Sequence, residues 1–331
     1  MEQSRYTVWF GGTVLLALAA LAGFNYAAGA YIFASPNGAS VQTLSGFERA
    51  LKPVWLDQVQ PDTVFVGSSR IRDGFDPTLI DPVLHIRSFN YGASSIAPYE
   101  ARRFAQDALA QPSVRSVVVA LDAFTGNGGE GEATPSFDET RLSVTPQGTP
   151  TPRRALWLFT TRFLSGGALG MNALGVWSLL QLKHGQTAAD RPDIFGAYSH
   201  MTAAVMAHDL AYRRARTFTM GPRAAGELDR LLDIACHANA KLTLYFPPDR
   251  IEIQARYQAG DGPGLAKFKR DVQVMVARHN ASCTGQIALY DFLNDNALTR
   301  EPLTGGQAAD YVDLVHIRPP IGVHLLKQMG F

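Results

Sequence analysis

The chain opens with an uninterrupted apolar stretch that differs from everything after it. No residue from 7 to 34 is charged, and this length suits the roughly 20 residues of a helix that crosses a bilayer. Arg5 precedes the stretch, and the next basic residue is Arg49. Because positive charge favours the cytoplasmic side, this asymmetry predicts a cytoplasmic N-terminus and an exported body. We therefore expect residues 1–35 to be a membrane anchor in contact with lipid.

A cleaved signal peptide is the alternative to a permanent anchor. Small residues in Asn25-Tyr-Ala-Ala-Gly-Ala30 offer a site for a peptidase. The apolar stretch exceeds the usual hydrophobic region of a signal peptide, which favours the anchor. Residues 36–60 then form a predicted tether, with a short helical stretch around residues 47–56.

Strand-like and helix-like patterns alternate through the rest of the chain. Strands are predicted at residues 63–66, 85–91, 115–121, 241–246 and 287–290, and helices at residues 94–109, 226–239 and 265–279. We expect Ser94 and Ser95 to cap the first of these helices. The run Val117-Val-Val119 is typical of a central strand that is buried on both faces. The alternation predicts one α/β domain over residues 61–331, with a parallel sheet and helices on both faces.

An insertion interrupts this alternation at about residues 125–225. Gly, Glu, Thr and Pro dominate residues 125–152, which predicts a loop. Helical patterns follow at residues 153–182 and 198–216, so we expect an α-helical insertion or cap. Its apolar stripe is more typical of core packing than of a substrate groove, and comprises Met171, Leu174, Trp177, Leu180 and Leu182.

Composition narrows the classes of function. With 331 residues, 46% hydrophobic, the chain can bury a full core. Its net charge is +1 and it has no Lys/Arg block, which excludes a nucleic-acid binder. The two cysteines, Cys236 and Cys283, are too few for a disulfide scaffold and lack metal-ligand spacing. Two separate buried thiols are the favoured interpretation, and a disulfide between them is the alternative in an exported protein.

Residues with chemical potential follow the predicted strands. Ser68 and Ser69 follow the first strand, Gly92 the second and Asp122 the third. Functional groups of open parallel sheets gather at the carboxyl ends of the strands, so these residues are expected to meet at one edge.

A serine nucleophile is the chemistry that this pattern predicts. Ser69 needs an imidazole to accept its proton and a partner to orient that imidazole, and Asp313-Leu-Val-His316 supplies both. The backbone N–H groups of Ser69 and Gly92 are the expected oxyanion donors. The alternatives are a helix-capping role for Ser69, and a surface pair or, with Asp310, a metal site at Asp313 and His316. Metal is disfavoured because no second histidine lies at ligand spacing.

Asp122 and the arginines after Ser69 have a supporting role in this interpretation. We expect Asp122 to form a salt bridge with Arg70 or Arg72, although it can also orient the Ser69 loop or cap a helix. Arg70 and Arg72 can instead read an anionic or hydroxyl-rich substrate. No cofactor follows from these residues.

Four segments, in order, carry a resemblance to a known family. They are Gly67-Ser68-Ser69, Asn90-Tyr91-Gly92, Val119-Ala-Leu-Asp122-Ala-Phe124 and Asp313-Leu-Val-His316. Over residues 61–331 the chain resembles the SGNH hydrolase superfamily. More narrowly, it is similar to the membrane-anchored SGNH-like proteins of bacterial exopolysaccharide and cell-wall acylation systems, such as alginate acetylation and teichoic acid D-alanylation.

The resemblance implies a three-layer α/β/α, flavodoxin-like fold and a role for each matching residue. It makes Ser69 the nucleophile, with Ser68 where the family has Asp, and it assigns Gly92, Asp313 and His316 to the family's other blocks. One departure concerns the oxyanion hole, since Asp122 stands where the hydrolases supply an asparagine. Asn127 is the candidate replacement.

The resemblance also implies a function and a location. It suggests a serine O-acetyltransferase or carbohydrate esterase acting on a cell-surface polysaccharide, held in the bacterial inner membrane by a single span with its body in the periplasm. A membrane-bound acyltransferase or polysaccharide synthase complex is the implied partner. The alternative is an inactive SGNH-fold scaffold or a polysaccharide-binding component of such a complex.

Overall fold

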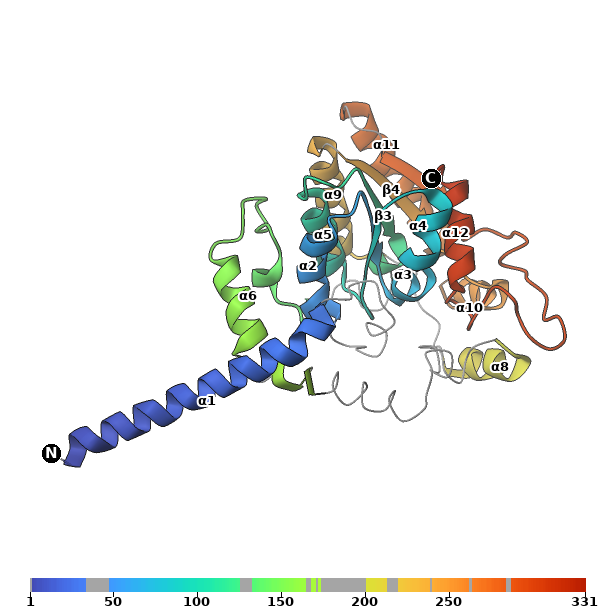
Figure 1. The fold of residues 1–331 in the computed structure, drawn as a ribbon. Coiled ribbons are helices and arrows are strands. Elements are labelled where there is room, and N and C mark those ends of the chain that lie inside the picture. The colour runs from blue at the N-terminus through green and yellow to red at the C-terminus, as the bar shows by residue number, and fades with distance from the viewer. Residues whose placement is uncertain are drawn as a thin grey trace.

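The structure is a computed structural model (Figure 1). It consists of an α/β body and one long helix that projects from it. The structure describes residues 2–33, 48–125, 133–164, 168–170, 172–173, 201–212, 220–238, 240–261, 264–283 and 287–331.

The body is built on a five-stranded parallel sheet. Its strands, in the order β2-β1-β3-β4-β5, are β1 (Thr63–Gly67), β2 (Ser88–Gly92), β3 (Ser116–Ala120), β4 (Lys241–Phe246) and β5 (Ile287–Asp291). Each coincides with a predicted strand, although β2 begins three residues later than expected. The central position of β3 is confirmed, and its Val117-Val-Val119 run is fully buried because helices cover both faces.

Helices form a layer on each face of the sheet (Figure 1). One layer contains α2 (Glu48–Val59), α5 (Pro98–Leu109), α9 (Pro222–His237) and α11 (Gly264–Ser282). The other contains α3 (Ser69–Gly74), α4 (Pro77–Leu84) and α12 (Pro319–Gln328). The predicted arrangement of helices on both faces of a parallel sheet is therefore confirmed.

The short helix predicted around residues 47–56 is α2, and its Leu51, Trp55 and Leu56 are buried in the main core. This part of the expected tether therefore packs into the body. Residues 34–47 lie outside the described part of the chain. Helix α5 begins at Pro98 rather than after Ser94 and Ser95, since proline suits a first helical turn.

The insertion between β3 and β4 is described in part. It includes η3 (Glu139–Arg141), α6 (Arg154–Phe163) and α8 (Ala203–Tyr212), so helices occur within both predicted helical ranges. The expected apolar stripe (Met171, Leu174, Trp177, Leu180 and Leu182) lies outside the described residues. Elements that were not expected include α4 after β1, η2 (Leu121–Phe124) after β3 and α10 (Ile251–Asp261) after β4.

The projecting helix is α1 (Glu2–Phe33). Its segment Tyr6–Ala28 is long and apolar enough to cross a membrane. Large apolar side chains of this segment, including Leu15 and Leu16, are exposed along it.

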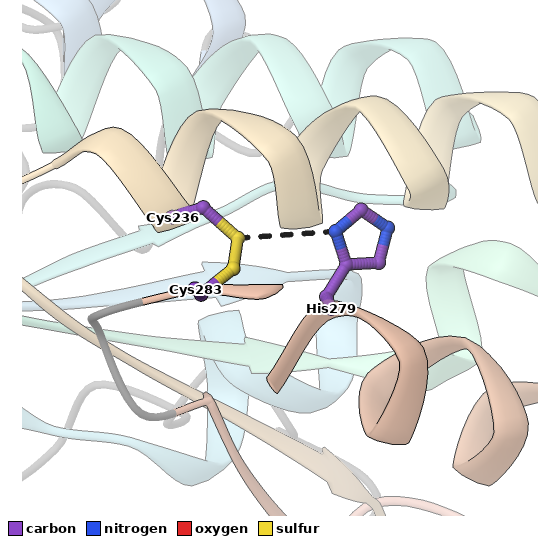
Figure 2. A group of neighbouring side chains, drawn as sticks. All are labelled: Cys236, His279 and Cys283. Atoms are coloured by element: carbon purple, nitrogen blue, oxygen red, sulfur yellow. Dashed lines mark hydrogen bonds between the residues drawn. A yellow bond between two sulfur atoms is a disulfide. The ribbon is translucent and has the colours of Figure 1, made fainter. Parts of the chain in front are cut away.

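Cys236 and Cys283 form a disulfide (Figure 2). The favoured expectation of two separate thiols is therefore wrong. Cys236 lies at the end of α9 and Cys283 directly after α11, and their Cα atoms lie 5.2 Å apart, within the range that a disulfide spans. Sequence alone does not show that these two helices end side by side.

We expect Cys283→Ser to lower the free energy of unfolding by about 2–4 kcal/mol. The bond joins residues 47 positions apart, so its loss frees a long loop in the unfolded chain. Urea unfolding of the oxidised protein, the reduced protein and the variant measures this effect. The reduced protein should match the variant; equal stability of the variant and the oxidised protein would contradict the expectation.

Candidate active site

Ser69 lies at the turn from β1 into α3. Ser68 caps this helix: its Oγ accepts a hydrogen bond from the Arg70 N–H at 3.2 Å and donates to Asp122 Oδ2. Because Ser68 performs the capping, the alternative role of Ser69 as a helix cap is wrong. The Ser69 side chain is left to interact elsewhere.

Ser69, His316 and Asp313 form a continuous chain of hydrogen bonds. Ser69 Oγ lies 2.8 Å from His316 Nε2, and His316 Nδ1 lies 2.7 Å from Asp313 Oδ2. A carboxylate can only accept, so Nδ1 carries the proton and the Nε2 lone pair faces the serine hydroxyl. All three residues are partly buried. The structure therefore brings the three predicted residues together, although Ser69 and His316 are 247 positions apart in the sequence.

The turn that carries His316 is fixed independently of Ser69. Asp313 Oδ1 accepts hydrogen bonds from the N–H groups of Val315 and His316, both at 2.8 Å. Tyr311 and Ile317 close the turn with an antiparallel bridge. One oxygen of Asp313 thus shapes the turn while the other orients the imidazole.

Two segments that the sequence did not point to hold this turn in place. Leu314 O accepts a hydrogen bond from the Arg250 N–H at 3.0 Å. The Leu314 N–H donates to Asp209 Oδ2, on α8 of the insertion, at 3.3 Å. The insertion therefore contacts the candidate site directly.

Gly92 allows β2 to approach α3 but does not offer its N–H to a ligand. A Cβ at Gly92 would lie 2.4 Å from Arg72 N, so only glycine fits. Its N–H donates to Asn90 Oδ1 at 2.9 Å, which contradicts the expected oxyanion role. Within the described residues the Ser69 N–H has no acceptor, so this second expected donor stays available.

Asn90 fastens α3 to β2. Its Nδ2 donates to the carbonyl oxygens of Ile71, Arg72 and Phe75 at 2.8, 3.1 and 2.7 Å. Ile71 and Arg72 belong to α3, the helix that begins with Ser69, and Phe75 follows it directly. This role of Asn90 was not predicted, and the signal for it in the sequence is an amide side chain inside a buried strand.

A buried ionic cluster lies beside the serine. Arg70 Nη1 contacts Asp249 Oδ1 at 2.7 Å, and Arg70 Nε lies 3.6 Å from Asp122 Oδ2, which confirms the expected pairing of Asp122 with Arg70. Burial lowers the pKa of Arg70, but the two carboxylates more than offset this and raise it. Asp249 was missed, although it follows β4 closely, as Asp122 follows β3.

The other residues predicted to support the site are Arg72, Asp122 and Asn127. Arg72 pairs with Glu48 and Asp73 and also donates to Ser94 Oγ, so its charge, like that of Arg70, is neutralised within the protein. This argues against the alternative that either arginine reads a substrate. Asp122 Oδ1 is buried and accepts no hydrogen bond from the described residues. Asn127 lies outside them.

Lys52 of α2 contacts the end of β2, which carries Asn90 and Gly92. Its Nζ donates to Gly92 O at 2.6 Å and to Asn90 Oδ1 at 3.1 Å. Burial lowers the pKa of Lys52 from 10.5 to about 7, against the opposing effect of Glu48.

The pH dependence of unfolding tests this burial. Between pH 7 and 10.5 the unfolded chain holds a proton on Lys52 that the folded protein has lost, so this group makes stability rise with pH in that window. Between pH 7 and pH 10 the unfolding free energy of the unaltered protein should increase by roughly 3 kcal/mol more than that of Lys52→Met. Urea unfolding across this range measures the difference, and parallel pH profiles would contradict it.

One group in the described residues has side chains close enough to share a metal ion, Cys236, His279 and Cys283. Both sulfurs belong to the disulfide, and His279 Nδ1 lies 3.8 Å from Cys236 Sγ (Figure 2). His279 Nε2 is 2.8 Å from Asp229 Oδ1. In the oxidised protein this group therefore lacks thiolate ligands.

Comparisons with known proteins give no match, either to a protein-family model or to a curated protein. Function must therefore be argued from the geometry of the site.

Proposed function

We propose that this protein is a membrane-anchored, SGNH-like serine enzyme that transfers or removes acyl groups, chiefly acetyl, on a cell-surface polysaccharide. The observation that carries the proposal is the hydrogen-bonded series from Ser69 through His316 to Asp313. The same three groups, in the same roles, define nucleophilic serine catalysis on unrelated folds.

Each group has one task in the proposed reaction. His316 Nε2 takes the proton of Ser69 as Oγ attacks the acyl carbonyl, and Asp313 stabilises the imidazolium that results. The Ser69 N–H donates to the oxygen of the tetrahedral intermediate. His316 then protonates the leaving group, which leaves an acyl-serine. A sugar hydroxyl or water, deprotonated by His316, attacks this ester and releases the acyl group.

The oxyanion hole distinguishes this site from that of an efficient hydrolase. Asp122 stands where the resemblance calls for an asparagine donor, and the Gly92 N–H is occupied by Asn90. Loss of one such donor costs about 10²–10³-fold in rate. We therefore expect slow turnover of simple esters and favour transfer to a bound acceptor. The same departure supports the alternative of an inactive scaffold.

The proposed location is the bacterial inner membrane, with the body in the periplasm. Helix α1 supports the anchor, and the disulfide supports an oxidising compartment such as the periplasm. An acyl group used there must cross the bilayer, so we infer a membrane-bound acyltransferase or polysaccharide synthase complex as partner.

An acetyl-ester assay with and without oligosaccharide tests the function. The purified full chain is incubated with 4-nitrophenyl acetate, and released nitrophenol, free acetate and acetylated sugar are measured, with Ser69→Ala as control. A transferase yields acetylated sugar and an esterase yields acetate. Rates equal to those of Ser69→Ala for both products would favour the scaffold.

A further inference from the structure

Helix α6 exposes large apolar side chains where a water-facing helix would carry polar ones. Leu156, Trp157 and Phe159 are 56%, 47% and 52% exposed. Leu164 and Leu169, shortly after the helix, are exposed as well. Scattered apolar residues are normal on protein surfaces, but a group of this size on one short segment marks an interaction surface.

The same helix is fastened to α1 through a buried polar contact. Asn25 of α1 is fully buried, and its Nδ2 donates to Phe163 O, at the end of α6, at 2.9 Å. Asn172 Nδ2 donates to Asn25 Oδ1 at 3.0 Å. The rings of Tyr26 and Phe163 also meet, with centroids 6.1 Å apart. Figure 1 shows α6 beside the C-terminal part of α1.

The start of α6 is held by the α/β body. Arg154 donates through Nε to Arg141 O at 2.8 Å and through Nη2 to Pro53 O at 3.2 Å, and it pairs with Asp57 of α2. The helix is therefore fixed between α1 and the body. Its orientation, and that of its exposed apolar residues, is set by contacts at both ends.

We propose that α6 lies in the membrane interface and inserts Leu156, Trp157 and Phe159 among the lipids. Asn25 lies three residues before the end of the apolar segment Tyr6–Ala28, so its contacts place α6 near the end of the proposed span. A helix of ten residues is about 15 Å long, too short to cross the hydrocarbon core, so it lies along the surface. Tryptophan is favoured at this depth.

The bilayer is the occupant that these contacts favour, because the end of α6 contacts α1 at Asn25 and Tyr26, within the apolar segment proposed to enter lipid. The inference rests on the proposed anchor and adds a second membrane contact to it. Two attachments, at α1 and α6, hold the body at a fixed angle to the membrane instead of leaving it on a single span.

Spin labels on the full chain in nanodiscs of phosphatidylethanolamine and phosphatidylglycerol test the inference. Nitroxides are attached at Phe159→Cys, at Leu16→Cys as a reference within α1, and at Val274→Cys on α11. Val274 is a matched control because it is apolar and 68% exposed. The native cysteines are in a disulfide and do not react. Power saturation then compares collisions with oxygen, which enters lipid, and with a water-soluble nickel chelate.

We expect oxygen to dominate severalfold at positions 16 and 159, and the nickel chelate to dominate at position 274. Nickel access at 159 equal to that at 274, with 16 in lipid, would overturn the inference while the anchor stands. Water access at both position 16 and position 159 would overturn the proposed anchor as well as the inference about α6. Protection of 159 from both reagents would mean that a protein surface, such as a second copy, covers α6, which would also overturn the inference.

Discussion

Ser69→Ala is expected to lower the turnover of an activated acetyl ester by about 10⁴-fold or more. Without Oγ no acyl-enzyme forms, and His316 has no proton to accept from the residue that it contacts at 2.8 Å. The measurement is the initial rate of nitrophenol release by the full chain in detergent. Substantial activity in this variant would rule out Ser69 as the nucleophile.

Ser282→Ala is the matched control for this change. Ser282 lies at the end of α11, and within the described part of the chain its hydroxyl donates to the carbonyl oxygens of Arg278 and His279 in its own helix. Removal of this hydroxyl should leave the rate unchanged. A large loss in both variants would point to general damage to the protein and not to the chemistry of Ser69.

Asp313→Asn should lower the same rate by about 10²–10⁴-fold while the fold is kept. The asparagine retains an oxygen that can accept from the N–H groups of Val315 and His316, so the turn survives. Its amide nitrogen, however, then faces His316 Nδ1 and favours the tautomer with the proton on Nε2. That tautomer donates to Ser69 and cannot act as its base.

A structural role for Asp313 predicts a different outcome. If Asp313 only shapes the turn, the Asp313→Asn variant would keep both the unfolding free energy and the ester turnover. Turnover lost together with stability would likewise leave the orienting role unsupported. The proposed role requires a drop in turnover at unchanged stability, measured by urea unfolding of the same samples.

The sheet and the edge that carries the candidate site could be predicted because they follow from local patterns. Runs such as Val117-Val-Val119 are buried on both faces only in a covered parallel sheet, and parallel strands bring their carboxyl ends to one edge. This rule places the serine turn and Asp122 at the same edge, and the structure adds that β1 and β3 are neighbours. The meeting of Ser69 with the distant Asp313 and His316 could be proposed because their chemistry is complementary.

The remaining contacts depend on atomic positions that no pattern encodes. Whether Ser68 or Ser69 caps α3 is decided by the direction of one turn. The sequence predicts the Gly92 N–H as an oxyanion donor, but in the structure this group donates to the side chain of Asn90. Likewise, Asp209 reaches the His316 turn from an insertion more than 100 residues earlier in the chain.

Covalent labelling with a fluorophosphonate tests the serine chemistry most directly. The full chain is treated with the reagent, digested and mapped by mass spectrometry, alongside His316→Ala. We expect a single adduct on Ser69, formed far more slowly in His316→Ala because the hydroxyl then lacks its base. Absence of an adduct at Ser69, or equal labelling in the two proteins, would contradict a nucleophilic serine at this site.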